Sequence, residues 1–133
     1  MTDNDTTLEQ RRERGRQLVA DMLGEDSAEE TIAHWDAISP EFSGYVTEFL
    51  AGEIWSRSGL DRRTKSLVSI AALASLGRTR ALELNLRFAL KNGATRQDIV
   101  ETLLQIAPYS GFPVTWDALA RLDEIEPRTA ATS

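Results

Sequence analysis

The sequence contains no cysteine and only one histidine among its 133 residues. Without cysteine the chain has no disulfide, no thiolate nucleophile and no cysteine ligand for zinc. The histidine, His34, lies beside Trp35, and no residue nearby in the sequence pairs with it. We therefore expect His34 to have a surface or packing role, and any catalysis to depend on other side chains.

The sequence also lacks an excess of basic residues and a long apolar run. Its 15 lysines and arginines are outnumbered by 21 aspartates and glutamates, and the formal charge of -6 argues against nucleic acid as a partner. The longest apolar region, Leu67 to Leu76, is too short to cross a bilayer, and the N-terminal stretch MTDNDTTLEQ contains no hydrophobic signal core. We expect a cytoplasmic protein without a membrane partner.

Hydrophobic residues recur with a helical period along nearly the whole chain, and the alternation typical of strands is missing. The length fits one domain. These features predict an all-α fold, a compact and orthogonal arrangement of about six helices of ordinary length. The domain is expected over residues 8–125, between flexible tails at residues 1–7 and 126–133.

Capping residues, glycines and prolines set the expected helix boundaries. Gly24 ends a first helix over residues 8–23, and Ser27 caps a short second helix that runs to about residue 37. Asp61 caps a helix over residues 62–76, and a further helix covers residues 79–91. Thr95 caps the next helix, which we expect to run to about Ala107 and to be broken by Pro108, Gly111 and Pro113. A last helix covers residues 114–125.

A helix that begins at Pro40 has apolar residues at spacings of three and four, so we expect this face to meet a core. These residues are Phe42, Tyr45, Val46, Phe49 and Leu50. The following segment, Ala51 to Gly59, contains two glycines and no clear periodicity. Such a segment can line a pocket. Its candidate side chains for binding or catalysis are Glu53, Trp55 and Arg57.

Two segments taken together resemble the carboxymuconolactone decarboxylase family, whose superfamily includes the alkylhydroperoxidase-like proteins. The first is GEIWSRSGLDRRTKSL, Gly52 to Leu67, with matching residues Gly52, Arg57, Gly59, Leu60, Asp61, Arg63, Ser66 and Leu67. The second is ALKNGATRQDIVETLLQIAPYSGFP, Ala89 to Pro113, with matching residues Asn92, Gly93, Thr95, Asp98, Ile99, Glu101, Leu103, Gln105, Ala107, Tyr109, Gly111 and Pro113. The resemblance extends from about Gln10 to Leu122.

The resemblance implies a small helical protomer that assembles as a ring, commonly a homotrimer or homohexamer, with active sites between helices near subunit contacts. The namesake reaction removes carbon dioxide from a lactone dicarboxylate and gives an enol-lactone without a metal or organic cofactor. Electrons from the departing carboxylate must reach the lactone carbonyl through the conjugated alkene. The site therefore needs a hydrogen-bond donor at that oxygen, an acid that protonates carbon, and a cation for the anionic substrate.

Two arginines are candidates for holding a substrate carboxylate, because a guanidinium binds a carboxylate through two parallel hydrogen bonds. They are Arg57 and Arg87, and for each the alternative is an ordinary salt bridge. Glu53 stands at a position that the family usually fills with an acid, so it is a candidate general acid or base. Its alternative role is to pair with Arg57 or to cap a helix.

Aromatic residues supply the remaining candidates. Tyr109 can donate a phenol hydrogen bond into a pocket bordered by Phe112 and Trp116, and Trp55 is a further substrate-binding candidate. The alternative for Tyr109 is core packing, with its hydroxyl bonded to the backbone.

Asn85 stands where decarboxylases of this family usually have a histidine, two residues before the arginine retained here as Arg87. A histidine exchanges protons near neutral pH, with a reference pKa of about 6.5, whereas an asparagine does not. The amide can still donate to a carbonyl or stabilise an enolate. The peroxidase branch of the superfamily has two cysteines near that histidine, where this chain has Arg78 and Ala81, so peroxidase activity is not expected.

Two classes of function follow from these residues. The first is a cofactor-independent lyase of the carboxymuconolactone decarboxylase type that acts on an anionic lactone or related cyclic carbonyl compound. The replacement of the family histidine by Asn85 leaves open a diverged isomerase or cyclase of secondary metabolism. The second class is a non-catalytic oligomeric protein that binds a small molecule and has lost turnover.

Overall fold

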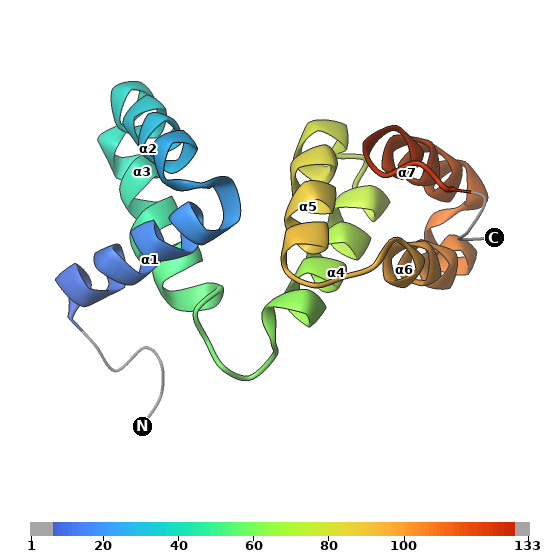
Figure 1. Cartoon of the computed structure of the whole chain (residues 1–133), viewed down its shortest axis with the longest axis horizontal. Helices are drawn as coiled ribbons and strands as arrows, with labels where there is room; N and C mark the ends of the chain where they lie inside the picture. Colours follow the sequence, from blue (N-terminus) through green and yellow to red (C-terminus); the bar gives the residue numbers. More distant parts are fainter. Residues whose placement is uncertain (1–6, 130–133) are drawn as a thin grey trace. The chain divides into compact units, whose positions relative to one another are not determined.

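A computed structural model describes residues 7–129, and within them the chain forms seven α-helices, one π-helix and no strand (Figure 1). The all-α fold class is therefore confirmed. Contacts group the chain into two compact units, residues 1–60 (unit 1) and residues 61–133 (unit 2). A single domain over residues 8–125 stays a prediction. Residues 1–6 and 130–133, which belong to the predicted tails, lie outside the described residues.

Unit 1 begins with two helices that meet at a glycine. Helix α1, Leu8–Leu23, starts with a capping box between Thr7 and Gln10, and helix α2 covers Glu25–Ile38. The prediction that Ser27 caps the second helix is wrong, because Gly24 serves both as the end of α1 and as the cap of α2. Its φ of 88° lets the chain turn at a single residue, and acidic side chains then occupy the favourable first turn of α2.

Helix α3, Pro40–Gly44, continues into the π-helix η1, Tyr45–Ile54. The amide of Trp55 donates to the carbonyl of Leu50 at 2.9 Å, the spacing of five residues that defines a π-helix. Part of the segment predicted to lack periodicity is thus helical. The buried residues of α3 and η1 are all small: Ser43, Thr47, Ala51 and Gly52.

The small residues of η1 pack against α1, whose buried residues are Gly15, Leu18, Val19 and Met22. The prediction that the aromatic face of this helix meets a core is therefore wrong within unit 1. Phe42, Tyr45, Phe49 and Leu50 are exposed. Backbones in close contact leave no space for large side chains, so the small residues occupy the contact.

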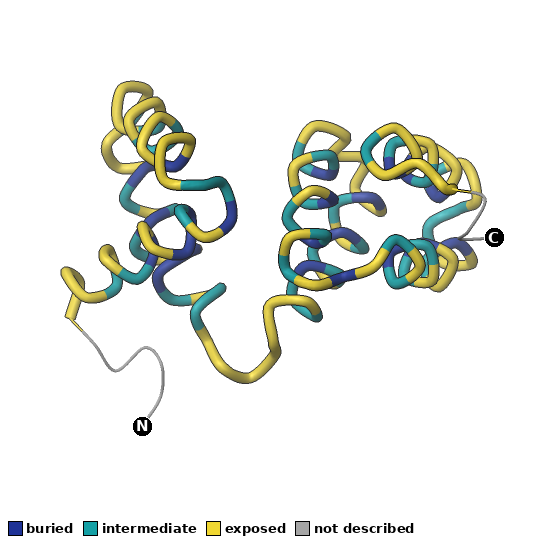
Figure 2. Tube along the Cα trace, viewed as in Figure 1, coloured by how far each residue is buried: buried dark blue, intermediate teal, exposed yellow. Residues whose placement is uncertain are grey.

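Unit 2 consists of α4, Arg62–Ser75, α5, Thr79–Lys91, α6, Arg96–Ser110, and α7, Phe112–Ile125. Its core contains side chains from all four helices. Figure 2 shows buried positions along each of these helices. The buried members are Ile70, Ala74, Leu82, Leu86, Ala89, Ala94, Ile99, Leu103, Ala118 and Leu122. The predicted caps Asp61 and Thr95 are confirmed, since each accepts a hydrogen bond from the amide three residues later.

Helix α6 continues through Pro108 to Ser110, so the expected end near Ala107 is wrong. Proline near the end of a helix removes one hydrogen bond without ending the last turn. The helix ends at Gly111, which has a φ of 106° and whose amide donates to the carbonyl of Ala107 at 2.9 Å.

Helices α4 and α6 lie side by side and run in the same direction. Near their N-terminal ends Arg63 and Asp98 form an ion pair at 2.7 Å, and at their C-terminal ends the hydroxyls of Ser75 and Ser110 are 2.7 Å apart. The hydrogen bond from Arg63 lowers the pKa of Asp98 to about 2, and the Thr95 amide acts in the same direction. Among the described residues no helix is long and apolar enough to span a bilayer.

Candidate functional site

Three of the predicted site residues stand at the end of η1 in unit 1. Glu53 and Trp55 are half-buried, and Arg57 is exposed. The last turn is held to α1 by Arg14, whose Nε and Nη2 donate to the carbonyl of Gly52 at 3.1 and 2.9 Å. The hydroxyl of Ser56 also donates to the carbonyl of Ala51 at 2.7 Å. These bonds fix the carbonyl groups of the two residues that precede Glu53.

The carboxylate of Glu53 makes no hydrogen bond or ion pair within residues 7–129. The alternative role, in which Glu53 pairs with Arg57 or caps a helix, is therefore not observed. Glu48, on the preceding turn, instead forms an ion pair with Arg12 of α1. Of these two carboxylates on η1, Glu53 is the one that is not engaged in an ion pair and can take part in proton transfer.

Two further candidates lie on α5 in unit 2, on different sides of the helix. Asn85 is half-buried, and its amide nitrogen donates to the carbonyl of Ala81 at 2.9 Å. Arg87 is exposed and forms an ion pair with Glu83 at 3.4 Å. Residues two apart on an α-helix do not face each other. The side chains of Asn85 and Arg87 therefore project in different directions from α5, and the helix alone does not bring them together.

Tyr109, Phe112 and Trp116 are placed around the turn between α6 and α7. Their exposed fractions are 84%, 68% and 75%, so unit 2 does not enclose them in a pocket. The alternative of core packing for Tyr109 is excluded by the same observation. Phe112 and Trp116 are four residues apart on α7 and so share one face of that helix. All three side chains are open to solvent within unit 2.

A groove of about 410 Å³ between α4 and α6 was not predicted from the sequence. Its apolar lining consists of Leu67, Val68, Ala71 and Ile106, and its polar lining of Thr64, Glu101, Thr102 and Gln105. On each helix these residues are three or four apart, so they share one face. This spacing is the feature of the sequence that indicates a shared face.

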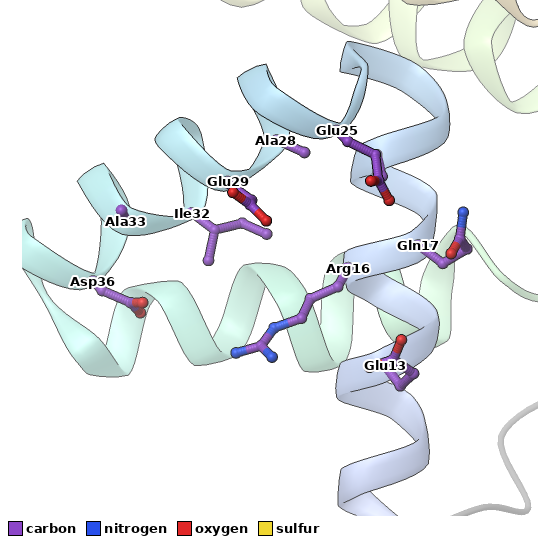
Figure 3. Close-up of a pocket in the computed structure, with 10 residues that line it drawn as sticks. Glu13, Arg16, Gln17, Glu25, Ala28, Glu29, Ile32, Ala33 and Asp36 are labelled. Carbon is purple, nitrogen blue, oxygen red and sulfur yellow. The ribbon is translucent and has the colours of Figure 1, made fainter.

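A second groove, of about 310 Å³, lies between α1 and α2 (Figure 3). Its acidic lining residues are Glu13, Glu25, Glu29 and Asp36, and Arg16 is the basic residue among those that line it. A groove lined mainly by carboxylates repels an anionic ligand. This groove therefore does not suit the anionic substrate expected from the sequence, and neither groove is lined by a predicted site residue.

Comparison with known proteins decides the family. The model of the carboxymuconolactone decarboxylase family matches residues 40–124. The chain belongs to this family. The matched range includes all the predicted site residues, from Glu53 to Trp116, and leaves α1 and α2 outside it.

Two relatives of this chain have names that state an activity. A 4-carboxymuconolactone decarboxylase from Acinetobacter baylyi is 34% identical over 117 residues, which cover 88% of this chain and 87% of the relative. A nitrosuccinic acid decarboxylase from Metarhizium robertsii is 32% identical over 107 residues, which cover 79% of this chain and 73% of the relative. Both named reactions are decarboxylations.

A metal site is not evident in residues 7–129, which contain no group of three or more histidine, aspartate or glutamate side chains placed to hold a metal ion. The titratable and polar candidates are thus single residues distributed over the end of η1, helix α5 and the turn between α6 and α7. Each position offers one function: a carboxylate at Glu53, an amide at Asn85, a guanidinium at Arg87 and a phenol at Tyr109.

Proposed function

We propose that this protein is a cofactor-independent, decarboxylase-type carbon–carbon lyase that acts on an anionic lactone or a related cyclic carbonyl compound. The observation that carries the proposal is the 34% identity to a 4-carboxymuconolactone decarboxylase over 88% of the chain. The relative named for nitrosuccinic acid supports the reaction type and widens the range of substrates to be tested.

The two named substrates make a common demand on a catalyst. Carboxymuconolactone loses its carboxylate into a conjugated lactone carbonyl, and nitrosuccinic acid has a nitro group on a carbon that bears a carboxylate. In both molecules an electron-accepting group receives the electron pair that carbon dioxide leaves behind. A hydrogen-bond donor aimed at the oxygen of that group stabilises the transition state, and an acid then protonates carbon.

Each candidate side chain suits one of these tasks. The guanidinium groups of Arg57 and Arg87 bind a carboxylate. The amide nitrogen of Asn85 has two protons and uses one for the carbonyl of Ala81, so the other can be donated to an electron-accepting oxygen. Glu53, which has no ion-pair partner in the described residues, is the proposed proton donor to carbon.

The aromatic candidates supply contact area and one further hydrogen bond. Trp55, Phe112 and Trp116 offer apolar surface against a ring, and the phenol of Tyr109 donates a hydrogen bond to the substrate. The exposure of Tyr109, Phe112 and Trp116 within unit 2 is consistent with a surface that a ligand or another subunit covers.

One observation favours a second candidate. Asn85 lacks the proton exchange of the histidine that decarboxylases of the family usually have, which favours a diverged isomerase or cyclase of secondary metabolism. In such an enzyme the amide would hold an enolate while a different bond is made or moved. A non-catalytic binding protein is the remaining alternative.

We also propose a homo-oligomer, a trimer or a hexamer, as the resemblance implies. Support comes from the exposed aromatic residues of both units, because monomeric soluble proteins rarely expose large contiguous apolar patches.

The test is a decarboxylation assay of the purified protein with 4-carboxymuconolactone and, separately, with nitrosuccinate. Release of carbon dioxide is measured for the unmodified protein, Asn85→His and Glu53→Gln. Turnover by the unmodified protein that Glu53→Gln lowers by about 100-fold or more supports the proposed lyase and the role of Glu53. Turnover by Asn85→His alone supports the diverged enzyme. Binding without turnover in every variant, seen as a thermal shift, supports the binding protein.

A further inference from the structure

We propose that Arg14 of α1 is a positioning residue for Glu53, because it holds the peptide group from which this glutamate extends. Its guanidinium binds the carbonyl oxygen of Gly52, the residue before Glu53. This role rests on the proposed function, in which Glu53 delivers a proton to carbon. Arg14 lies outside residues 40–124, which the family model matches, so the contact joins α1 to the matched part of the chain.

The contact between Arg14 and Gly52 consists of two hydrogen bonds to one oxygen atom. Nε and Nη2 of the guanidinium donate to the Gly52 carbonyl at 3.1 and 2.9 Å, and the contact is partly buried. A hydrogen bond from a charged donor is about twice as strong as one between neutral groups. The two donors are also fixed in the plane of one guanidinium. The carbonyl is therefore restrained in orientation as well as in position.

Gly52 lies in the last turn of η1, where carbonyl groups lose their amide partners within the helix. The π-helical pattern is still present at Trp55, whose amide donates to a carbonyl five residues earlier at 2.9 Å. The pattern has changed at Arg57, whose amide donates to Ile54, three residues earlier, at 3.4 Å. A cation is favourable at such an end, because the carbonyl groups there carry partial negative charge. Arg14 supplies this cation from a different helix.

The backbones of α1 and η1 are in close contact at the same place. A β-carbon added to Gly52 would lie 2.2 Å from the carbonyl oxygen of Arg11. Arg11 and Arg14 are three residues apart on α1, so they lie on the same side of that helix. One turn of α1 therefore contacts Gly52 at its α-carbon and at its carbonyl oxygen.

The peptide group between Gly52 and Glu53 transmits this restraint to the glutamate. A peptide group is planar, and its atoms include the carbonyl oxygen of the first residue and the α-carbon of the second. A restraint on the Gly52 oxygen is therefore a restraint on the α-carbon of Glu53. The Glu53 carboxylate has no hydrogen bond or ion pair among the described residues. Its location thus depends on this backbone and on its own rotamer.

Position is critical for a group that protonates carbon. A general acid must lie within about 2.6–3.2 Å of the atom that it protonates. Misplacement of a reacting group by about 1 Å can lower a rate by about 100-fold. Loss of the two bonds from Arg14 should therefore lower kcat by displacing Glu53. Arg14 acts here through Glu53 and not on the substrate itself.

The test uses the full chain and three variants of α1. Arg14→Met keeps the apolar part of the side chain and removes its donors, and Arg14→Lys keeps the charge without the planar fork. Arg12→Met is the matched control. It removes the ion pair with Glu48, which also joins α1 to η1 but involves a carboxylate and not a backbone carbonyl. Circular dichroism and thermal unfolding verify that each variant is folded at the assay temperature.

Steady-state decarboxylation of 4-carboxymuconolactone and of nitrosuccinate is measured for the four proteins. We expect Arg14→Met to lower kcat by about tenfold or more while KM is nearly unchanged. The kcat of Arg14→Lys should lie between those of Arg14→Met and the unmodified protein, and Arg12→Met should have nearly the unmodified kcat. An equal loss of kcat in Arg12→Met and Arg14→Met would overturn the positioning role.

A double variant separates an effect through Glu53 from a general loss of activity. Glu53→Gln removes the proposed proton donor, so adding Arg14→Met to it should cause little further loss of kcat. A further loss as large as that caused by Arg14→Met alone would show that Arg14 acts independently of Glu53. That result would also overturn the positioning role.

A measurement without substrate tests the restraint itself. Hydrogen exchange of backbone amides, followed by NMR, reports local opening at the end of η1. Because hydrogen bonds to a charged group are lost, exchange at the amides of Glu53 and Ile54 should be about tenfold or more faster in Arg14→Met than in Arg12→Met. Equal exchange rates in the two variants would contradict the restraint on which the role depends.

The same assays distinguish failure of the positioning role from failure of the proposed function. Turnover by the unmodified protein with an unchanged kcat in Arg14→Met would overturn the role of Arg14 alone. No turnover of either substrate by the unmodified protein would overturn the proposed function and, with it, the role of Arg14 in catalysis.

Discussion

Gly15 of α1 lies so close to Thr47 of η1 that a β-carbon added to Gly15 would be 1.8 Å from the carbonyl oxygen of Thr47. No side chain fits at this distance without movement of the backbone. This contact determines the orientation of η1, with its small residues toward α1 and its aromatic residues away from it. It also places Glu53 at the end of a helix that is fixed along one side.

The close contact predicts that Gly15→Ala destabilises the protein. Alanine normally stabilises a helix relative to glycine by up to about 1 kcal/mol. Here the overpacking should reverse the sign and cost about 1–3 kcal/mol. The measurement is the free energy of unfolding from denaturant titration, read with a probe in unit 1 such as the fluorescence of Trp35.

Gly44→Ala is the matched control. Gly44 is also helical, but the nearest atom to its added β-carbon is a side-chain oxygen of Glu48 at 3.6 Å, an ordinary contact. We expect this variant to be neutral or slightly more stable. If Gly15→Ala were as stable as Gly44→Ala, the described packing of α1 on η1 would be incorrect.

The ion pair between Arg63 and Asp98 predicts a dependence of stability on pH. The pKa of Asp98 is lowered to about 2 in the folded protein, against about 3.9 for an unfolded aspartate. A group with a lowered folded pKa contributes stability above its unfolded pKa, and this contribution is lost as the pH falls through the folded value. Asp98→Asn should therefore be less stable than the unmodified protein at pH 7, and the difference should disappear between about pH 4 and pH 2.

The measurement for this pair is the midpoint of thermal unfolding of both proteins across that pH range. Asparagine still accepts a hydrogen bond at the start of a helix, so the comparison isolates the charge. Asp117→Asn, on the exposed side of α7, is the control. The midpoint of thermal unfolding of this variant should not converge with that of the unmodified protein in the same way as the pH falls. A gap between the unmodified protein and Asp98→Asn that persisted at pH 2 would contradict the assigned ion pair.

The sequence was sufficient for features that depend on local chemistry. The caps at Asp61 and Thr95 and the glycine that ends α1 were predicted from residue types alone, because a side-chain oxygen or a positive φ acts within one turn. The end of α6 lies beyond the expected Ala107, because Pro108, one of the residues expected to break the helix, lets it continue and Gly111 ends it. A proline in the last turn removes one bond, whereas the glycine permits the change of direction.

Packing partners were not predictable in the same way. The spacing of Phe42, Tyr45 and Phe49 shows that they share a face, but it does not show what that face meets. The decisive residues were Gly15 and Gly52, whose lack of a side chain allows close contact between helices far apart in the sequence. No local pattern reports such a contact.

The candidate site also has features that the sequence predicts and features that it does not. Resemblance to the family supplied the candidate positions, but it did not show on which side of its helix each of Asn85 and Arg87 lies. On α5 they lie on different sides, since two residues correspond to more than half a turn. Glu53 was predicted with an ion pair as its alternative role, and the structure shows no such pair among the described residues.

Arg87 allows substrate binding to be separated from stability. Its ion pair with Glu83 is exposed and four residues apart on a helix, so either partner contributes less than about 0.5 kcal/mol to folding. We expect Arg87→Gln to raise the KM for an anionic substrate by about tenfold or more while the free energy of unfolding hardly changes. Steady-state kinetics and denaturant titration measure the two quantities.

Two controls belong to this experiment. Glu83→Gln removes the same ion pair but keeps the guanidinium, so it should leave KM nearly unchanged. Arg80→Gln removes an exposed cation from the same helix, and it should also have little effect. Equal changes in KM for Arg80→Gln and Arg87→Gln would indicate a general effect of charge and would contradict a specific role for Arg87.

Asn85 gives the sharpest prediction about mechanism, because its substitutions separate hydrogen bonding from proton exchange. Asn85→Ala removes the donor proposed for the electron-accepting oxygen, and loss of such a donor typically lowers kcat by about 10²- to 10³-fold. Asn85→His restores a side chain that donates and also titrates, with a reference pKa of about 6.5. The pH profile of kcat/KM for Asn85→His should therefore gain an inflection near that pH, which the unmodified protein lacks. An unchanged kcat in Asn85→Ala would show that the amide does not contact the reacting group, and the donor would then have to be sought at Tyr109.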